Sequence, residues 1–116
     1  IAPGCHVREH SHADREEIIF VLQGNGITTI QGEPHPMIPG TFFYLGPNTC
    51  HTFRNPGAEP LIVAWTIVPA GLENFFEAIG RPRAPGEPAP APFDRPDSVT
   101  PQVTTFVDPI TPGEDA

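Results

Sequence analysis

Short apolar segments separated by turn residues dominate the first two thirds of the chain. The run IIFVL at residues 18–22 is continuously apolar, which is typical of a buried strand, and the Asn25-Gly26 pair after it favours a tight turn. Further β-branched or aromatic runs occupy residues 27–30, 41–45, 50–54 and 61–68. Three prolines among residues 31–40 predict a loop there. This pattern predicts an antiparallel sandwich or barrel of short strands.

The hydrophobic period changes from two to that of a helix at residues 71–80. Its apolar positions follow the spacing i, i+3, i+4, i+7 and share one helical face: Leu72, Phe75, Phe76 and Ile79. We expect this helix to pack as a lid over apolar barrel surface, with its two phenylalanines serving as core residues rather than as ligand contacts.

The length of 116 residues suits one domain with one core. We expect a β-barrel core over residues 1–70, a C-terminal helix packed on it over residues 71–80, and an extended tail over residues 81–116. The tail carries nine prolines in 36 residues, with room for one short strand at residues 102–107.

Charge and composition exclude several functions. The formal net charge is −8, which argues against nucleic acid or an anionic membrane surface as a partner, because both require a basic face. No apolar run reaches the ~20 residues of a membrane span, and no signal segment opens the chain. All six cationic residues are arginines, so Schiff-base chemistry and a phosphate-loop lysine are excluded.

The two cysteines, Cys5 and Cys50, lie in different segments and form no CxxC pair. We expect free thiols and therefore a cytoplasmic protein. Neither serine has the surroundings of a nucleophile elbow. Any catalysis must therefore depend on histidines and carboxylates.

Three histidines and one glutamate form a candidate metal site. His10 and His12 are two residues apart, so on an extended strand both point to the same face. Glu17 begins the next strand and His51 belongs to a different hairpin. Imidazole and carboxylate ligands suit iron, manganese, cobalt, nickel, copper or zinc without choosing among them. On this pattern alone, paired histidines are more often solvated surface residues. His6 and His35 are expected to be surface residues.

The wider spacing is more specific. Gly4, His10, His12, Glu17 and Gly24 stand as G-x5-H-x-H-x4-E-x6-G, whereas Gly40, Pro47, Asn48, His51 and Asn55 stand as G-x6-P-N-x2-H-x3-N. Over residues 4–68, the chain resembles the cupin superfamily. The first string fits the family's first motif at every position. The second departs where the family usually has Pro-x-Gly, but Asn48 tolerates the left-handed conformation that such a turn requires.

The resemblance implies an all-β fold, the cupin double-stranded β-helix or jelly-roll barrel, followed by one C-terminal helix and the proline-rich tail. It also implies one divalent transition metal, with iron or manganese preferred, held by His10, His12, Glu17 and His51. Glu17 rather than Glu16 is the expected ligand, because six residues separate it from Gly24, as the motif requires. Glu17 is also the expected catalytic residue, since a carboxylate that leaves the metal accepts a proton from a substrate hydroxyl.

The resemblance to quercetinase-like single-domain cupins implies a metal-dependent oxidoreductase, a dioxygenase. Aromatic residues on the strands, Phe53 and Trp65 among them, favour a small apolar or aromatic substrate of the enol or phenol type, with dioxygen as the second reactant. A cupin lyase, decarboxylase or isomerase, or a non-catalytic small-ligand-binding cupin, is the alternative.

Cupin barrels usually have one or two strands before the first motif, whereas nine residues precede His10 here. Either the natural chain starts earlier, or a neighbouring chain supplies the edge of the sheet. Exposed sheet edges are costly, so a homodimer is expected.

Overall fold

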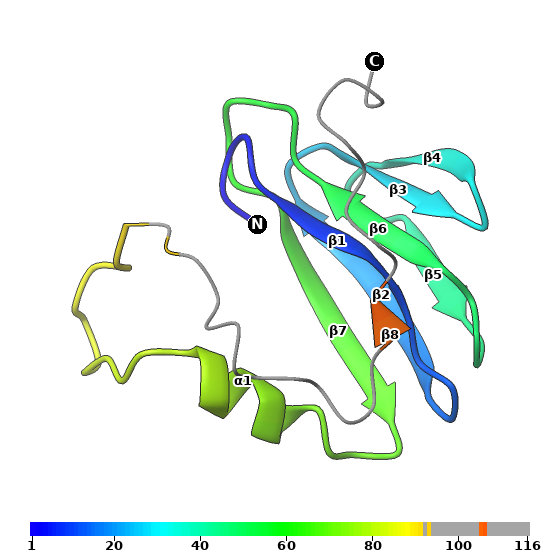
Figure 1. Ribbon diagram of the computed structural model, residues 1–116. Helices are drawn as coiled ribbons and strands as arrows, with labels where there is room; N and C mark the ends of the chain where they lie inside the picture. The colour runs from blue at the N-terminus through cyan, green and yellow to red at the C-terminus, as the bar shows by residue number, and fades with distance from the viewer. Residues whose placement is uncertain (92, 94–104, 107–116) are drawn as a thin grey trace.

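The structure, a computed structural model, describes residues 1–91, 93, 105 and 106. Within these ranges the elements are β1 (His6–Ser11), β2 (Glu16–Gln23), β3 (Gly26–Ile30), β4 (Glu33–Met37), β5 (Phe42–Leu45), β6 (His51–Arg54), β7 (Ile62–Val68), α1 (Glu73–Ile79) and β8 (Thr105–Phe106). They form the all-β jelly roll, with one helix after the barrel, that the sequence predicts (Figure 1).

Two antiparallel sheets face one another and enclose the core (Figure 1). One sheet has the strand order β4-β3-β6-β1-β8, and the other has the order β5-β2-β7. The buried apolar side chains between them are Ile19, Val21, Met37, Leu45, Phe53 and Leu61. Both sheets therefore direct one face inward, and the core fixes which residues point into the barrel.

Strand β2 shows how side-chain alternation places the site. Glu17, Ile19 and Val21 are buried, while the residues between them are exposed. Because successive side chains point to opposite faces of a strand, Glu17 lies on the same inner face as the core residues that follow it. The alternation that builds the core therefore also carries a carboxylate into the barrel.

The loop predicted for residues 31–40 is wrong in part, because residues 33–37 form strand β4. Pro34 and Pro36 pair with Thr29 and Ile27 of β3, at the edge of the larger sheet. Pro34 and Pro36 are two residues apart, so their backbone nitrogens, which lack a hydrogen, point to the same side of β4. An edge strand tolerates this when that side has no neighbouring strand to hydrogen-bond. Composition alone therefore gave the wrong prediction.

Helix α1 follows β7 and lies beside the barrel (Figure 1). Within the described ranges, no helix has the length and apolar character needed to cross a membrane. The strand expected at residues 102–107 is described only as β8, which pairs with β1 at the edge of the larger sheet. The rest of the expected tail beyond residue 93, and residue 92, lie outside the described residues.

Candidate functional site

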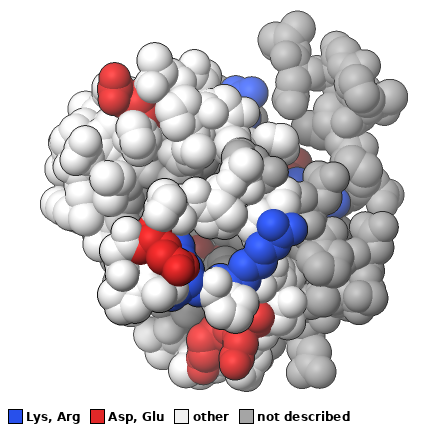
Figure 2. Space-filling model, turned by 90° about the vertical axis from the view of Figure 1, so that its left-hand side faces the viewer, with Lys and Arg blue, Asp and Glu red and all other residues white. Residues whose placement is uncertain are grey.

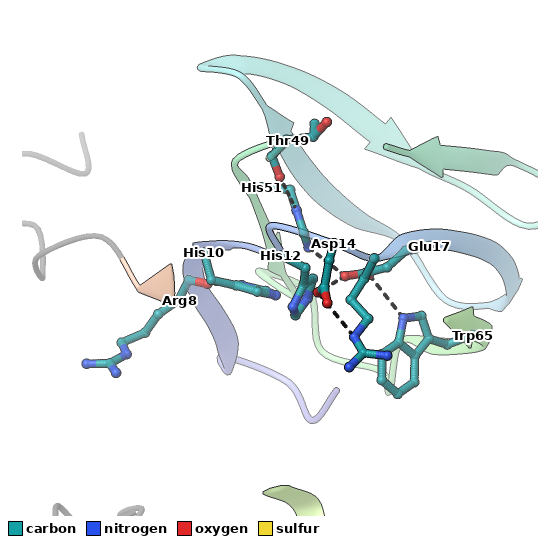
Figure 3. A network of polar contacts seen from close by, with 9 residues as sticks. Arg8, His10, His12, Asp14, Glu17, Thr49, His51 and Trp65 are labelled. Atoms are coloured by element: carbon teal, nitrogen blue, oxygen red, sulfur yellow. Dashed lines mark hydrogen bonds and ion pairs between the residues drawn. The ribbon is translucent and has the colours of Figure 1, made fainter. Parts of the chain in front are cut away.

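The structure brings His10, His12, Glu17 and His51 together inside the barrel. All four are buried, and one potential ligand atom from each lies within 4.8 Å of the others. Figure 3 shows their side chains converging from separate segments of the chain. The side chains singled out by spacing therefore form one compact group.

Strand pairing explains this convergence. His10 of β1 lies directly opposite His51 of β6, and their ring centroids are 4.2 Å apart. His12 follows the last residue of β1, and Glu17 lies on the inner face of β2 in the opposite sheet. The group therefore bridges the two sheets, so the barrel must close before the four side chains can meet.

Backbone carbonyls fix the orientation of two of the imidazoles. The Nδ1 atom of His10 lies 2.7 Å from the Arg8 carbonyl oxygen, and the Nδ1 atom of His51 lies 2.8 Å from that of Thr49. A carbonyl oxygen only accepts hydrogen bonds, so each Nδ1 must carry the proton and donate it. In the neutral ring, the lone pair is then on Nε2, as in a histidine prepared to bind a metal.

The two oxygens of the Glu17 carboxylate have different neighbours. Trp65 on β7 donates a hydrogen bond from its indole Nε1 to Oε2 at 3.0 Å, as Figure 3 shows. The other oxygen, Oε1, lies 2.5 Å from His12 Nε2 and 3.5 Å from His51 Nε2. Trp65 therefore fixes one carboxylate oxygen and leaves the second directed at the imidazoles.

Two buried polar atoms in this group, Glu17 Oε1 and His51 Nε2, form no hydrogen bond of normal geometry among the described residues, although Oε1 lies 2.5 Å from His12 Nε2. Both present lone pairs to the same small space, an arrangement that is unfavourable for two acceptors. A cation between them would satisfy both at once. The group, with its imidazole and carboxylate donors, is therefore compatible with a divalent metal ion.

Burial and neighbouring groups shift two pKa values in this cluster. Burial, together with the nearby His51, lowers the pKa of His10 from 6.5 to about 4, so the ring is neutral at pH 7. Burial raises the pKa of the Glu17 carboxyl, but the contacts with His12 and His51 lower it by more, and it lies well below its usual range. At neutral pH the cluster thus presents a carboxylate and at least one neutral imidazole, the forms that bind metals.

Acid is expected to destabilise the metal-free protein between pH 6.5 and about 4. In this interval an unfolded His10 takes up a proton that the folded protein excludes, so the free energy of unfolding falls as the pH falls. The slope from one such proton is at most ~1.4 kcal/mol per pH unit. Urea denaturation at several pH values measures this slope, and His10→Gln should make it shallower. An equal slope in both proteins would contradict the assignment.

A cavity of about 840 Å³ opens onto the group. Its walls are mostly apolar and include Phe53, Trp65 and all four residues of the predicted apolar helix face, Leu72, Phe75, Phe76 and Ile79. Figure 2 views the molecule from the α1 side and shows acidic and basic side chains near a hollow in this face. The helix therefore closes one side of the cavity.

The core role predicted for the helix phenylalanines is wrong, because α1 has no buried residue. Phe75 and Phe76 line the cavity instead, and the Phe76 ring meets the Trp65 indole edge-to-face with centroids 5.6 Å apart. Helical periodicity identified the apolar face correctly but does not distinguish a core contact from a cavity wall.

Arg15 connects the site to the helix. Its Nη1 atom donates hydrogen bonds to the carbonyl oxygens of Pro69 and Ala70, immediately before α1. The side chain is buried, and its Nε atom lies 3.5 Å from Asp14 Oδ1. Gly71 completes the turn with φ of +138°, and a Cβ atom there would lie 3.1 Å from Arg15 Nη2. The arginine therefore packs closely against the chain that leads into the helix.

Further residues named from the sequence lie outside the four-residue group or in the turn next to it. Glu16 lies outside the group and accepts a hydrogen bond from the Tyr44 hydroxyl. Asn48 adopts the left-handed conformation expected of it, with φ of +60°. His6 is exposed at the cavity margin and His35 is half-buried on β4, and neither belongs to the four-residue group. Both cysteines are free thiols.

Two contacts around the site were not predicted from the sequence: the hydrogen bond from Trp65 to Glu17 and the hydrogen bonds from Arg15 to the carbonyl groups before α1. Trp65 was considered only as one of several aromatic residues. For Arg15, the available signal was a lone arginine between two candidate ligands, a pattern that also fits a solvated surface residue.

The chain is similar in sequence to a known protein family and to enzymes with different names. Residues 1–67 match the family described as the cupin domain. The chain is 41% identical over 75 residues, 60% of its length, to a glucose-6-phosphate isomerase of Thermococcus gammatolerans. It is 29% identical over 96 residues, 79% of its length, to the quercetin 2,3-dioxygenase of Bacillus subtilis.

Among solved structures, a predicted oxalate decarboxylase from Thermotoga maritima is similar, with a TM-score of 0.56 and 27% identity over 58% of each chain. The chain spans only 39% of the isomerase and 28% of the dioxygenase. The names of these relatives refer to three different reactions.

Proposed function

Because this chain belongs to the cupin family, we propose that it is a metal-dependent enzyme whose ion is held by His10, His12, Glu17 and His51. The observation that carries the proposal is the convergence of these four buried side chains, with ligand atoms within 4.8 Å of one another, at a largely apolar cavity. Solvated surface histidines would not meet inside the barrel.

We propose iron or manganese as the ion, since three imidazoles and one carboxylate suit either metal. When bound, such an ion polarises an oxygen atom of the substrate. The protein supplies the rest: the carbonyl oxygens of Arg8 and Thr49 orient two imidazoles, and Trp65 orients the carboxylate. The apolar walls exclude water from the substrate.

The reaction we propose is a dioxygenation of a small apolar or aromatic substrate of the enol or phenol type. The cavity walls support it, because Phe53, Trp65 and the helix phenylalanines offer aromatic surface to a planar substrate. The similarity to a quercetin 2,3-dioxygenase over 79% of the chain also supports it. In this proposal Glu17 accepts the proton of the substrate hydroxyl at Oε1, the oxygen to which Trp65 does not donate, once that oxygen has left the ion.

An isomerase, lyase or decarboxylase, or a non-catalytic binding protein, is the alternative. The 41% identity to a glucose-6-phosphate isomerase favours the isomerase among these. A sugar phosphate needs cationic groups, however, and Arg8 is the one arginine among the described residues that line the cavity. The cavity chemistry therefore favours the dioxygenase.

We expect the protein to act on a small molecule in the cytoplasm, since two free thiols suit a reducing compartment. Dioxygen would be the second reactant.

The test is metal analysis of the purified protein, followed by oxygen uptake with flavonols, catechols and diketones. The dioxygenase proposal predicts uptake on at least one of these substrates, and the loss of that uptake in Glu17→Gln. A parallel assay measures interconversion of glucose 6-phosphate and fructose 6-phosphate. Metal binding with isomerisation and no oxygen uptake would replace the dioxygenase by the isomerase. Failure to bind any offered ion would remove both enzymes.

Trp65→Phe is expected to weaken metal binding by ~10-fold, because groups that orient a ligand contribute 10–100-fold to metal affinity. The change removes the indole donor to Glu17 but keeps an aromatic ring in the cavity wall. Calorimetric titration with Mn²⁺ or Co²⁺ measures the effect. Phe76→Leu is the matched control, since it removes the ring contact with Trp65 while leaving the hydrogen bond intact. Equal affinities in Trp65→Phe and the wild type would refute the role of the indole.

A further inference from the structure

The cavity has one permanently positive side chain in an otherwise mostly apolar wall. Among the described residues that line it, Arg8 is the one arginine and Glu17 is the one carboxylate. The other lining side chains that titrate are histidines, and apart from His6 these belong to the four-residue group. An arginine keeps its charge at every physiological pH. The proposed reaction gives the Arg8 side chain no role, so its position in the cavity wall needs a separate explanation.

A β-bulge in β1 determines which residue reaches the cavity. Between its pairings with Phe53 and His51, β1 has two residues, Arg8 and Glu9, where β6 has one. Such an extra residue disrupts the regular alternation and redirects side chains, which is why bulges are frequent next to active sites. Arg8 lines the cavity, whereas Glu9 does not. The bulge therefore places the cation of this pair, and not the acid, at the cavity wall.

The guanidinium of Arg8 lies at a distance from the four-residue group. Figure 3 shows the Arg8 side chain extending away from this group, whereas His10 on the same strand points into it. The contact between Arg8 and His10 is made by the backbone carbonyl of Arg8, so a change of the Arg8 side chain leaves that contact in place. A ligand that reaches both the four-residue group and the guanidinium is therefore elongated, with an apolar body that faces the apolar walls.

We propose that the Arg8 guanidinium binds a carboxylate of the substrate. The substrate class is then an apolar or aromatic acid whose carboxylate is remote from the hydroxyl that reacts. This inference rests on the proposed function, because it takes the hydroxyl end to lie at the four-residue group. The paired N–H donors of a guanidinium match the two oxygens of a carboxylate. One cation also balances the single charge of a carboxylate, whereas a phosphate monoester carries about −1.5 to −2 at neutral pH.

The charge of the whole chain makes a local cation necessary for this substrate class. The formal net charge is −8, so an anion is repelled by the protein as it approaches. Recognition of an anionic substrate must then come from a group in the cavity wall. Among the described lining residues, Arg8 supplies the one charge of the required sign that does not depend on pH.

The test compares the binding of para-coumarate and its neutral amide, which differ only at the end expected to meet Arg8. Calorimetry on the protein as purified, at neutral pH and under nitrogen, measures both affinities without oxygen-dependent turnover. We expect the acid to bind ~5–10-fold more tightly than the amide, the effect of a charge-assisted hydrogen bond at an exposed arginine. Arg8→Gln should abolish this preference and leave the affinity for the amide unchanged.

Arg83→Gln is the matched control, because it removes the same charge from an exposed arginine that does not line the cavity. It should keep the preference for the acid. Circular dichroism establishes that each variant is folded, and Arg8→Ala, a second neutral variant, decides if Arg8→Gln does not fold.

Three results would overturn the proposal. The first is a wild-type protein that binds acid and amide equally. The second is a preference that persists in the folded neutral variants of Arg8, since the carboxylate would then bind elsewhere, for example at the four-residue group. The third is an equal loss of the preference in Arg83→Gln, which would indicate a general effect of charge. Binding and turnover fail separately: a preference that depends on Arg8 supports the acid even without oxygen uptake, whereas uptake with neutral phenols and no preference retains the dioxygenase and removes the acid.

Discussion

Replacing Glu17 by Gln is expected to weaken the binding of a divalent metal ion by at least ~100-fold, more than the loss of a group that only orients a ligand. The change keeps the shape of the side chain and the acceptor for Trp65 but removes the negative charge from Oε1, which faces His12 and His51. Inside the barrel, where water does not screen the charge, that loss is large.

Glu16→Gln is the matched control for this variant. Glu16 is the neighbouring residue and the same residue type, but it points to the opposite face of β2 and contacts Tyr44. Its replacement should leave metal affinity unchanged. Trp65 is the only tryptophan in the chain, so quenching of its emission by Co²⁺ follows binding directly, alongside calorimetry. Equal affinities for the two variants would contradict the assignment of Glu17 as the ligand.

Gly24→Ala is expected to destabilise the protein by at least ~3 kcal/mol, one of the larger effects of a single substitution. Gly24 begins the tight connection between β2 and β3 with φ of +89°, a conformation that costs an alanine about 1–2 kcal/mol. A Cβ atom there would also overlap the Pro60 carbonyl oxygen and lie 3.0 Å from the Leu61 Cα atom. Both obstacles are backbone atoms, so the chain itself must move.

Gly32→Ala separates these two costs. Gly32 has nearly the same φ, +81°, but nothing lies within 4 Å of a Cβ atom there. It should therefore lose only the ~1–2 kcal/mol of backbone strain. Urea denaturation compares the free energies of unfolding, provided that the slopes of the transitions agree. Equal losses for both alanine variants would show that the contact with residues 60 and 61 does not matter.

Most of the strands, and the four candidate ligands, could be predicted from short patterns and spacings in the sequence. The runs around β2, β5, β6 and β7 were visible because each alternates or is continuously apolar between turn residues. The period of a strand places His10 and His12 on one face, whereas the complete set with Glu17 and His51 followed from the resemblance to the two cupin motifs. The structure does bring them together, whereas their role as ligands stays a prediction.

The rest depended on contacts between residues distant in the sequence. The hydrogen bond from Trp65 to Glu17 joins residues 48 positions apart, and it depends on the pairing of β2 with β7. Strand β4 was missed because an edge position makes its prolines acceptable, and edge positions follow from topology rather than composition. Phe76 lines the cavity because of where α1 packs. The helical periodicity of residues 72–79 predicts an apolar face but not which part of the protein that face contacts.

Through Arg15, the short loop between β1 and β2 both connects His12 to Glu17 and contacts the chain before α1. The residue stands between His12 and Glu17 in the sequence, and its guanidinium holds the carbonyl groups that precede α1. A substitution that resizes the cavity by shifting the helix will therefore also displace the segment that carries His12 and Glu17, two of the four clustered side chains. Engineers who wish to change selectivity should alter the ring surfaces of Phe75 and Phe76, and leave the attachment of the helix as it is.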